Sequence, residues 1–164
     1  MLVGVDVGKK HLAWCVVSEG VVRQWVLADL LEGTASAMAA VPPFKGAGKR
    51  GTIQHVINAM VAHLDAALPP GVERVHIEAQ LGMANLGAKT LSHAIQTYFL
   101  CRHGAEVLFL RPHGSTREKT TYAARKRAAV EAAEDALADQ PAAVEFLARH
   151  PKKDDLADAA LLAL

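Results

Sequence analysis

The chain has 164 residues, 51% of them hydrophobic, which is enough for one domain with a substantial core and too few for two full domains. The 18 Lys and Arg nearly balance the 17 Asp and Glu, so net charge alone does not indicate nucleic acid, a membrane surface or an acidic partner. No apolar run is long enough to span a bilayer, and Asp6 stands where a signal peptide needs an apolar core. We expect one soluble, intracellular domain, residues 1–164, with no membrane partner.

Three β-rich segments open the chain. Residues 2–8 and 12–18 are separated by a short turn, and residues 21–27 follow after another, so the spacing predicts a three-stranded antiparallel meander. Residues 29–51 lose this periodicity and are rich in Ala, Gly and Pro, which predicts a mobile loop.

Helices and strands alternate after this loop. Thr52 is a candidate N-cap for a helix that ends before Pro69, because apolar residues recur between them at helical spacing. The order strand, helix, strand that follows implies parallel pairing, so the fold class is α/β, a mixed five-stranded sheet flanked by helices. The remaining predicted strands cover 73–79 and 105–112, and the remaining helices cover 88–103, 116–140, 142–149 and 152–164.

Four carboxylates are expected at one end of this sheet. Asp6 lies in a strand that reads as buried, and Glu78 ends a strand that would run parallel beside it. Asp155 and Asp158 are three residues apart, so they project from one face of the terminal helix, with Asp154 close to that face. Singly, each is explained better as a turn-former, a solvated strand end or an acidic helix start. Together they favour a site for Mg²⁺ or Mn²⁺, which prefer oxygen ligands.

Basic residues cluster just before an acidic stretch. Six Lys and Arg residues fall within residues 111–127, and there is no further Lys or Arg before Glu145. Although the net charge of the chain is near zero, residues 111–127 therefore form a basic stripe suited to sequence-independent contacts with phosphates. A solvated helix face with pairs such as Arg127 and Glu131 is the alternative, and Tyr122 either stacks on a base or packs. The candidate DNA-binding residues are Arg117, Arg125, Lys126 and Arg127, with Arg111 and Lys119 in the same stretch and Lys49 and Arg50 in the predicted loop.

Four segments resemble a known family. "GVDVGKKHLAWCVV", "HIEAQLGMANLGAKTLSHAIQTYF", "YAARKRAAVE" and "KKDDLADAALLAL" are similar, in this order, to the blocks of the RuvC-like Holliday-junction resolvases of the ribonuclease H superfamily. The poxvirus-type and fungal mitochondrial branch is the closest match. The predicted loop at 29–51 is unmatched, and the first segment alone also resembles the start of IS110-type transposases.

The resemblance implies a ribonuclease H-like fold and a metal-dependent endonuclease of DNA recombination and repair. Such an enzyme resolves four-way junctions by paired symmetric nicks that leave 5′ phosphates, with two Mg²⁺ or Mn²⁺ ions per active site and branched DNA as its partner. It also implies a lysine that contacts the scissile phosphate or activates water, for which Lys119 and Lys126 are both candidates. The metal-binding and catalytic residues that it implies are Asp6, Glu78, Asp155 and Asp158, with Asp6 bridging the ions and Lys119 as the first choice for the catalytic lysine.

The family's dimer contact implies a role for the helix from Lys89 to Arg102. This helix is apolar on more than one face, so it is either simply buried or shared between the sheet and a second subunit. Tyr98 and Leu100 are the expected outward apolar residues. We expect a homodimer, because one carboxylate cluster supplies one incision and a junction needs two. The cytoplasm, a virus replication site or a mitochondrion would suit such an enzyme.

Three other functions match parts of the sequence. A transposase-like catalytic domain fits the first segment, but those chains carry a second large domain. A catalytically inactive junction-binding protein fits less well, because all four carboxylates are present. An actin-like ATPase or sugar kinase shares the "DxG" strand, but no Ser or Thr follows Gly8 at the positions that contact phosphate.

Overall fold

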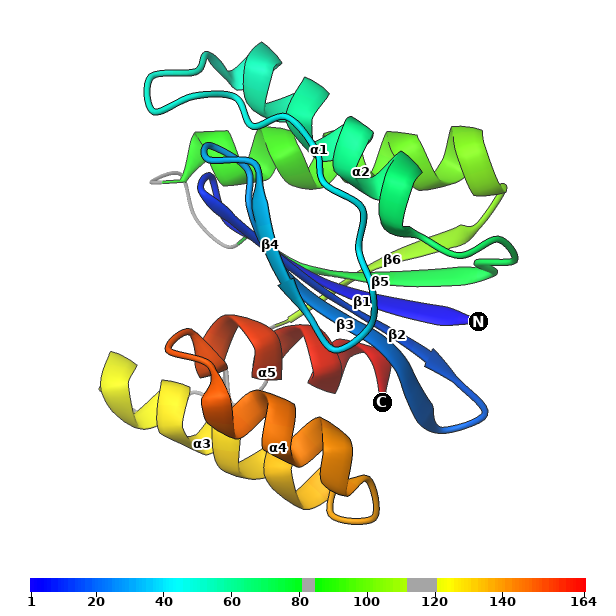
Figure 1. Cartoon of the computed structure of the whole chain (residues 1–164), viewed down its shortest axis with the longest axis vertical. Coiled ribbons are helices and arrows are strands. Elements are labelled where there is room, and N and C mark those ends of the chain that lie inside the picture. Colours follow the sequence, from blue (N-terminus) through cyan, green and yellow to red (C-terminus); the bar gives the residue numbers. More distant parts are fainter. Residues whose placement is uncertain (81–84, 112–120) are drawn as a thin grey trace.

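The computed structural model describes residues 1–80, 85–111 and 121–164 as a sheet between two layers of helices (Figure 1). Two helices, α1 (Ile53–Ala67) and α2 (Leu86–His103), cover one face, and α5 (Lys153–Ala163) covers the other. Outside α5 lie α3 (Tyr122–Ala136) and α4 (Pro141–Arg149). Within the described ranges, no helix is long and apolar enough to cross a membrane.

The sheet has six strands in the order β4-β3-β2-β1-β5-β6. The first four are antiparallel neighbours, whereas β5 and β6 run parallel to β1, as the meander and the strand–helix–strand order predict. The mixed α/β fold is therefore confirmed. The strands are β1 (Leu2–Val7), β2 (His11–Ser18), β3 (Val21–Asp29), β4 (Thr34–Ala37), β5 (Arg74–Glu78) and β6 (Glu106–Leu110).

The prediction of five strands is wrong by one, because β4 lies inside the predicted loop. Its sequence, "TASA", is short and made of small residues with little strand preference, so it forms only because the edge of β3 is there to pair with. The segment after it has no regular structure, but it is tied back by hydrogen bonds from Ala47 N to Leu30 O (2.7 Å) and from Gly48 N to Leu31 O (2.8 Å).

Alternation along the strands decides which side chains face α5. In β1, the three valines point into the core under α1 and α2, which leaves Gly4 and Asp6 on the α5 face. In β5, Ile77 points to the same core, which leaves His76 and Glu78 on the α5 face. His76 Nδ1 donates to the carbonyl oxygen of Leu162 in α5 (2.7 Å). Asp6 and Glu78 therefore emerge on one face of neighbouring parallel strands.

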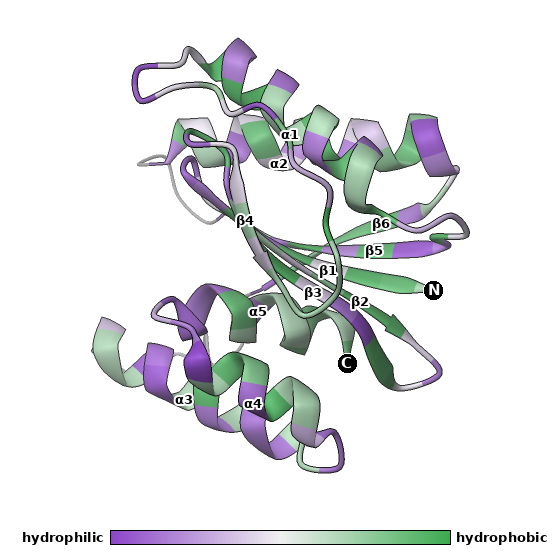
Figure 2. Cartoon of the chain, in the orientation of Figure 1, coloured by the Kyte–Doolittle hydropathy of each residue, from purple (hydrophilic) through white to green (hydrophobic). Residues whose placement is uncertain are grey.

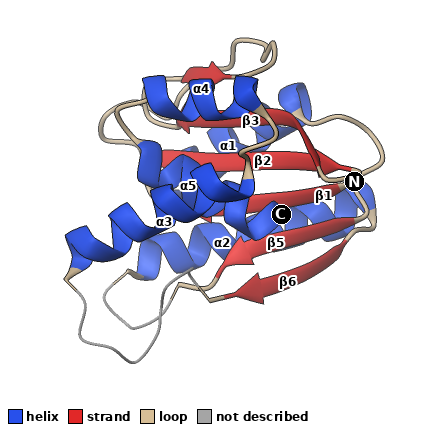
Figure 3. Cartoon of the chain, turned by 90° about the horizontal axis from the view of Figure 1, so that it is seen from below, coloured by secondary structure: helices blue, strands red, loops and turns tan. Residues whose placement is uncertain are grey.

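The helix α5 lies across the strands that carry these carboxylates. Figure 3, which views the molecule from below, shows α5 over the middle of the sheet. The helix α3 packs against the side of α5 that faces away from the sheet. In Figure 2, α5 changes from hydrophilic at its start to hydrophobic toward its end. This gradient follows the sequence, in which Lys153, Asp154 and Asp155 open the helix and Ala159 and Ala160 are fully buried.

The exposure of α2 corrects one expectation. Tyr98 is only 6% exposed, because its ring lies under α1 and its hydroxyl donates to Asp65 (3.1 Å). Arg102 pairs with the same carboxylate (3.1 Å). Tyr98 is therefore not an outward residue, since the covering helix α1 supplies a polar partner for its hydroxyl. Leu100 does face outward, with 50% of its surface exposed.

Candidate active site

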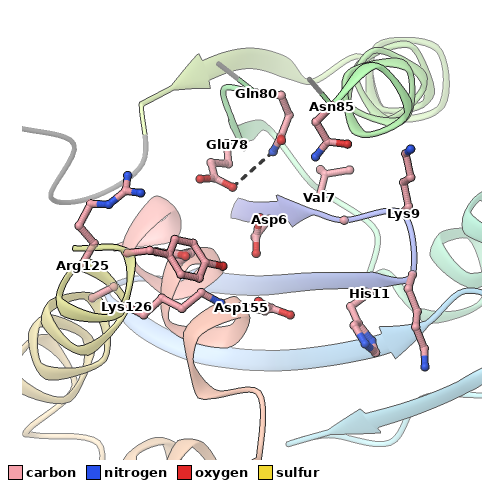
Figure 4. Close-up of a pocket in the computed structure, with 15 residues that line it drawn as sticks. Asp6, Val7, Lys9, His11, Glu78, Gln80, Asn85, Arg125, Lys126 and Asp155 are labelled. Atoms are coloured by element: carbon pink, nitrogen blue, oxygen red, sulfur yellow. Dashed lines mark hydrogen bonds between the residues drawn. The ribbon is translucent and has the colours of Figure 1, made fainter. Parts of the chain in front are cut away.

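All four predicted carboxylates line one cavity of about 530 Å³ at the carboxyl ends of β1 and β5 (Figure 4). Asp6 comes from β1 and Glu78 is the last residue of β5, while Asp155 and Asp158 come from the first turns of α5. Three elements far apart in the sequence thus contribute to one site. The convergence that the topology predicts is present in the fold.

Burial and mutual repulsion disfavour the charged forms of these groups. Burial raises the pKa of Asp6 well above its ordinary value, and a hydrogen bond to Glu78 and the charges of Glu78, Asp155 and Asp158 raise it further. Burial likewise raises the pKa of Asp158 to about 7, with contributions from Glu78 and Asp155 that are opposed by the positive charge of Lys126. The carboxyl groups of the cavity therefore resist full ionisation, and Lys126 offsets only part of their mutual repulsion at Asp158.

The chemistry of these donors fits a hard divalent cation, which binds carboxylate oxygens and would remove the repulsion that raises the pKa of Asp6. The side chains are nevertheless not assembled as a ligand shell. Within residues 1–80, 85–111 and 121–164, no three His, Cys, Asp or Glu side chains are grouped closely enough to hold an ion. Glu78, for example, accepts a hydrogen bond from Gln80 Nε2 (3.4 Å), as Figure 4 shows. Three or more of these carboxylates would have to change rotamer to bind one ion together.

A lysine reaches the cavity from the helix that packs outside α5. Lys126 of α3 lines the cavity and forms an ion pair with Asp154 of α5. Asp154 therefore contributes to the site indirectly, because its ion pair holds Lys126 next to the carboxylates. Of the two candidate lysines, Lys126 lies at the site. Lys119 lies outside the described residues.

The turn between β1 and β2 brings basic side chains to the cavity that sequence reasoning missed. Lys9, Lys10 and His11 all line it. Lys10 is held by Asp29, the last residue of β3 (3.2 Å), whereas the Lys9 chain lies against Gly87 at the start of α2, where any side chain would collide with it. A signal was available, because these residues directly follow the strand that carries Asp6.

Comparison with known proteins gives a match through structure alone. No family model matches the chain, and no curated protein does. The structure of Fowlpox virus resolvase in complex with its substrate Holliday junction DNA is similar, with a TM-score of 0.60 and 16% sequence identity over 99% of this chain and 93% of that one. This chain therefore shares the fold of that protein.

Two further structures are those of RuvC from T. thermophilus. The one in complex with a Holliday junction substrate has a TM-score of 0.49 and 18% identity, over 99% of this chain and 89% of that one. The other has a TM-score of 0.46 and 16% identity, over 99% and 90% of the two chains.

On this resolvase fold, the predicted DNA-binding residues separate into groups. Arg125 is exposed and lines the carboxylate cavity beside Lys126. Arg127 is exposed but lines a separate groove along α3 and the start of α5, which also contains acidic residues. Lys49 and Arg50 are exposed just before α1 and do not line the cavity. Arg117 lies outside the described residues.

Proposed function

We propose that this chain is a divalent-metal-dependent endonuclease that resolves four-way DNA junctions by paired symmetric nicks, in DNA recombination or repair. The supporting observation is the convergence of Asp6, Glu78, Asp155 and Asp158 in one cavity. The fold adds support, because the similar fowlpox virus protein is a resolvase solved with its junction substrate. Basic side chains on both sides of the cavity suit a substrate with a phosphate backbone.

In the proposed reaction, Asp6, Glu78, Asp155 and Asp158 would hold Mg²⁺ or Mn²⁺. When bound, such ions would activate a water molecule and stabilise the leaving 3′ oxygen, so that the product would carry a 5′ phosphate. Lys126 donates a hydrogen bond to the phosphate that is cut, because its ion pair with Asp154 holds it at the cavity. Lys9 and Arg125 bind phosphates on either side of the cut.

The test is cleavage of a labelled four-way junction beside a linear duplex of the same sequence. We expect paired nicks in the junction only, with Mg²⁺ or Mn²⁺, and none in EDTA. Ca²⁺ should allow binding without cleavage, because its looser coordination does not hold water and phosphate in line. Cleavage in excess EDTA would contradict the metal mechanism. Binding without cleavage in every metal would favour an inactive junction-binding protein, and equal cutting of the linear duplex would favour a transposase-like domain.

Paired nicking requires two active sites, so we also propose a homodimer with an isologous contact on the outward face of α2. Leu100 is exposed there, and Leu100→Glu should give monomers by light scattering with an unchanged circular dichroism spectrum. Ile53→Glu, at an exposed apolar position on α1, is the matched control. Tyr98→Glu is unsuitable, because it would bury a charge. A wild-type protein that is monomeric on junction DNA and still makes paired nicks would contradict the dimer.

A further inference from the structure

Tyr122 is an aromatic side chain that packing does not explain. The chain has four Phe, two Trp and two Tyr, and all of them lie in the described ranges. Tyr122 is 65% exposed, whereas the other seven are buried or half-buried. An exposed ring forgoes most of the stabilisation that burial of an aromatic side chain supplies, so a contribution to the core is not its role.

The position of Tyr122 is set by the start of α3. Thr121 caps this helix, and its hydroxyl accepts a hydrogen bond from Ala124 N (3.2 Å), so the first turn and the residue that opens it are fixed. From there Tyr122 lines the same cavity as the four carboxylates, and Lys9 lines it from the turn after β1. An exposed aromatic ring therefore lies at the wall of the proposed cutting site.

Two cations of the same helical turn accompany the ring. Lys126 Nζ lies 4.8 Å and Arg125 Cζ 5.8 Å from the centre of the Tyr122 ring, within the range of cation–π attraction. Lys126 is held in turn by its ion pair with Asp154. One turn of α3 therefore presents an aromatic surface and two positive charges together. This combination matches a nucleotide whose base is free to stack and whose phosphates are negative.

We propose that Tyr122 stacks on an unpaired nucleobase next to the phosphate that is cut, while Arg125 and Lys126 bind the phosphates of that strand. The proposal rests on the proposed function and names the feature of the substrate that the site would select. In a continuous duplex, both faces of each base are covered by its neighbours, so extruding a base is unfavourable. A branch point offers a base at lower cost, and Tyr122 therefore favours cutting beside the branch.

The experiment uses four-way junctions with the fluorescent base 2-aminopurine at successive positions beside the crossover. The complex is formed in Ca²⁺ with saturating protein, and a denaturing gel checks that the DNA is uncut. At one or two positions, the Tyr122→Leu complex should be several-fold brighter than the wild-type complex, because the ring that quenches the base is gone. Tyr122→Phe, which keeps the ring, should match wild type. Val21→Ala, at an exposed apolar residue between β2 and β3, is the matched control.

An abasic nucleotide at the responding position tests the same contact through affinity. The abasic nucleotide should weaken junction binding by the wild type about tenfold. It should not change the affinity of Tyr122→Leu, because that variant makes no stacking contact with the base that is removed. Equal fluorescence of wild type and Tyr122→Leu at every position would overturn the stacking contact. If wild type still cut junctions in that case, the proposed function would stand. If the wild type cut no junction while the ring-dependent signal persisted, the nuclease proposal would fail and base stacking would remain.

Discussion

The two faces of the sheet differ in the size of the side chains that fill them. The core under α1 and α2 contains large residues such as Trp14, Met60 and Phe99. Half of the buried residues in the core under α5 are alanine, although Trp25 is buried there too, and at Gly4 of β1 the backbones of β1 and α5 approach closely. Small side chains let α5 lie against β1 at short range. The first turns of α5 then bring two carboxylates beside Asp6. The small side chains on this face therefore serve to set the position of α5 relative to β1.

The two faces also differ in how their polar groups are satisfied. Under α1, the buried His63 accepts a hydrogen bond from Trp14 Nε1 (3.1 Å), and Asp65 is paired with Arg102. On the α5 face, Asp6 and Asp158 lie among other carboxylates that oppose their ionisation. Apart from His63 Nδ1, which has no hydrogen-bond partner among the described residues, these groups of the α1 face are paired within the protein. The other face holds carboxyl groups whose mutual repulsion Lys126 offsets only in part, and a bound cation would relieve it further.

The largest difference between the two faces is expected when carboxylates on each are neutralised and the cleavage rates are compared. Each substitution at the cavity should lower the cleavage rate by more than about 100-fold, because losing a direct ligand harms a metal site more than losing a supporting contact does. Junction binding, measured by gel shift, should survive or strengthen, since negative charge is removed. The substitutions are Asp6→Asn, Glu78→Gln, Asp155→Asn and Asp158→Asn.

The matched control for these variants is Asp65→Asn on the α1 side, where the carboxylate pairs with Arg102 in a partly exposed position. It should keep wild-type cleavage. Any of the four cavity variants that retained near-wild-type cleavage in Mg²⁺ would show that its residue is not a ligand.

The close approach of α5 predicts a large effect of one methyl group. In Gly4→Ala, the new Cβ would lie 2.7 Å from Ala163 N and closer still to Ala159 O, so α5 must move away from β1. We expect a loss of about 3 kcal/mol in the free energy of unfolding, at the upper end for overpacking, together with loss of cleavage. Urea denaturation followed by tryptophan fluorescence measures the first.

Gly20→Ala is the control for this substitution, because none of the described residues lies within 4 Å of the added Cβ and only the φ of +74° is strained. It should cost about 1 kcal/mol and leave cleavage intact. Equal stability of the Gly4→Ala and Gly20→Ala proteins would mean that the short packing distance is unimportant.

The two faces should respond to pH in opposite directions. Burial lowers the pKa of His63 from 6.5 to about 4, so between these values the unfolded chain binds a proton that the folded protein does not. The free energy of unfolding therefore falls by about 3 kcal/mol as pH drops from 6.5 to 4. The pKa of Asp158 is raised from 3.8 to about 7, so the folded protein keeps a proton that the unfolded chain releases. This second contribution falls as pH rises through that range.

Variants can separate these opposing contributions. In EDTA, Asp158→Asn should make stability rise more steeply between pH 4 and 6.5 than in wild type. His63→Gln, which keeps an acceptor for Trp14, should flatten or reverse that rise. Urea denaturation at several pH values measures both, and identical profiles for the three proteins would show that neither group governs the pH dependence.

The smallest effects are those on DNA affinity expected from the basic residues of α3. Replacing Arg125 or Lys126 with Ala should lower the slope of log affinity against log salt concentration by about 0.9 each, because each releases one counterion fewer from duplex DNA. Arg127→Ala should change the slope less, since that residue lines the separate groove. The triple variant should have the flattest slope, and Arg23→Ala on β3 is the control. An unchanged slope in the triple variant would make this stretch a solvated face.

Much of the fold follows from local patterns. Alternation in β1 and β5 and helical spacing in α1 and α2 mark these elements plainly. The strand β4 could not be predicted, because Thr34–Ala37 has no preference of its own and depends on an edge supplied by β3. At the site, the carboxylate positions were predictable, whereas Lys9 was overlooked because a lysine in a turn is ordinarily only solvated.

The sequence by itself determined which side chains point together. The two-residue period of a strand puts Gly4 and Asp6 on one face, and the three-residue spacing of Asp155 and Asp158 puts both on one side of a helix. Only the tertiary structure decided what those faces meet. The packing of the helices decides that α1 covers Tyr98. It also decides that Lys126 pairs with Asp154. Backbone geometry is local, whereas the partner of each face is chosen by packing between segments distant in the chain.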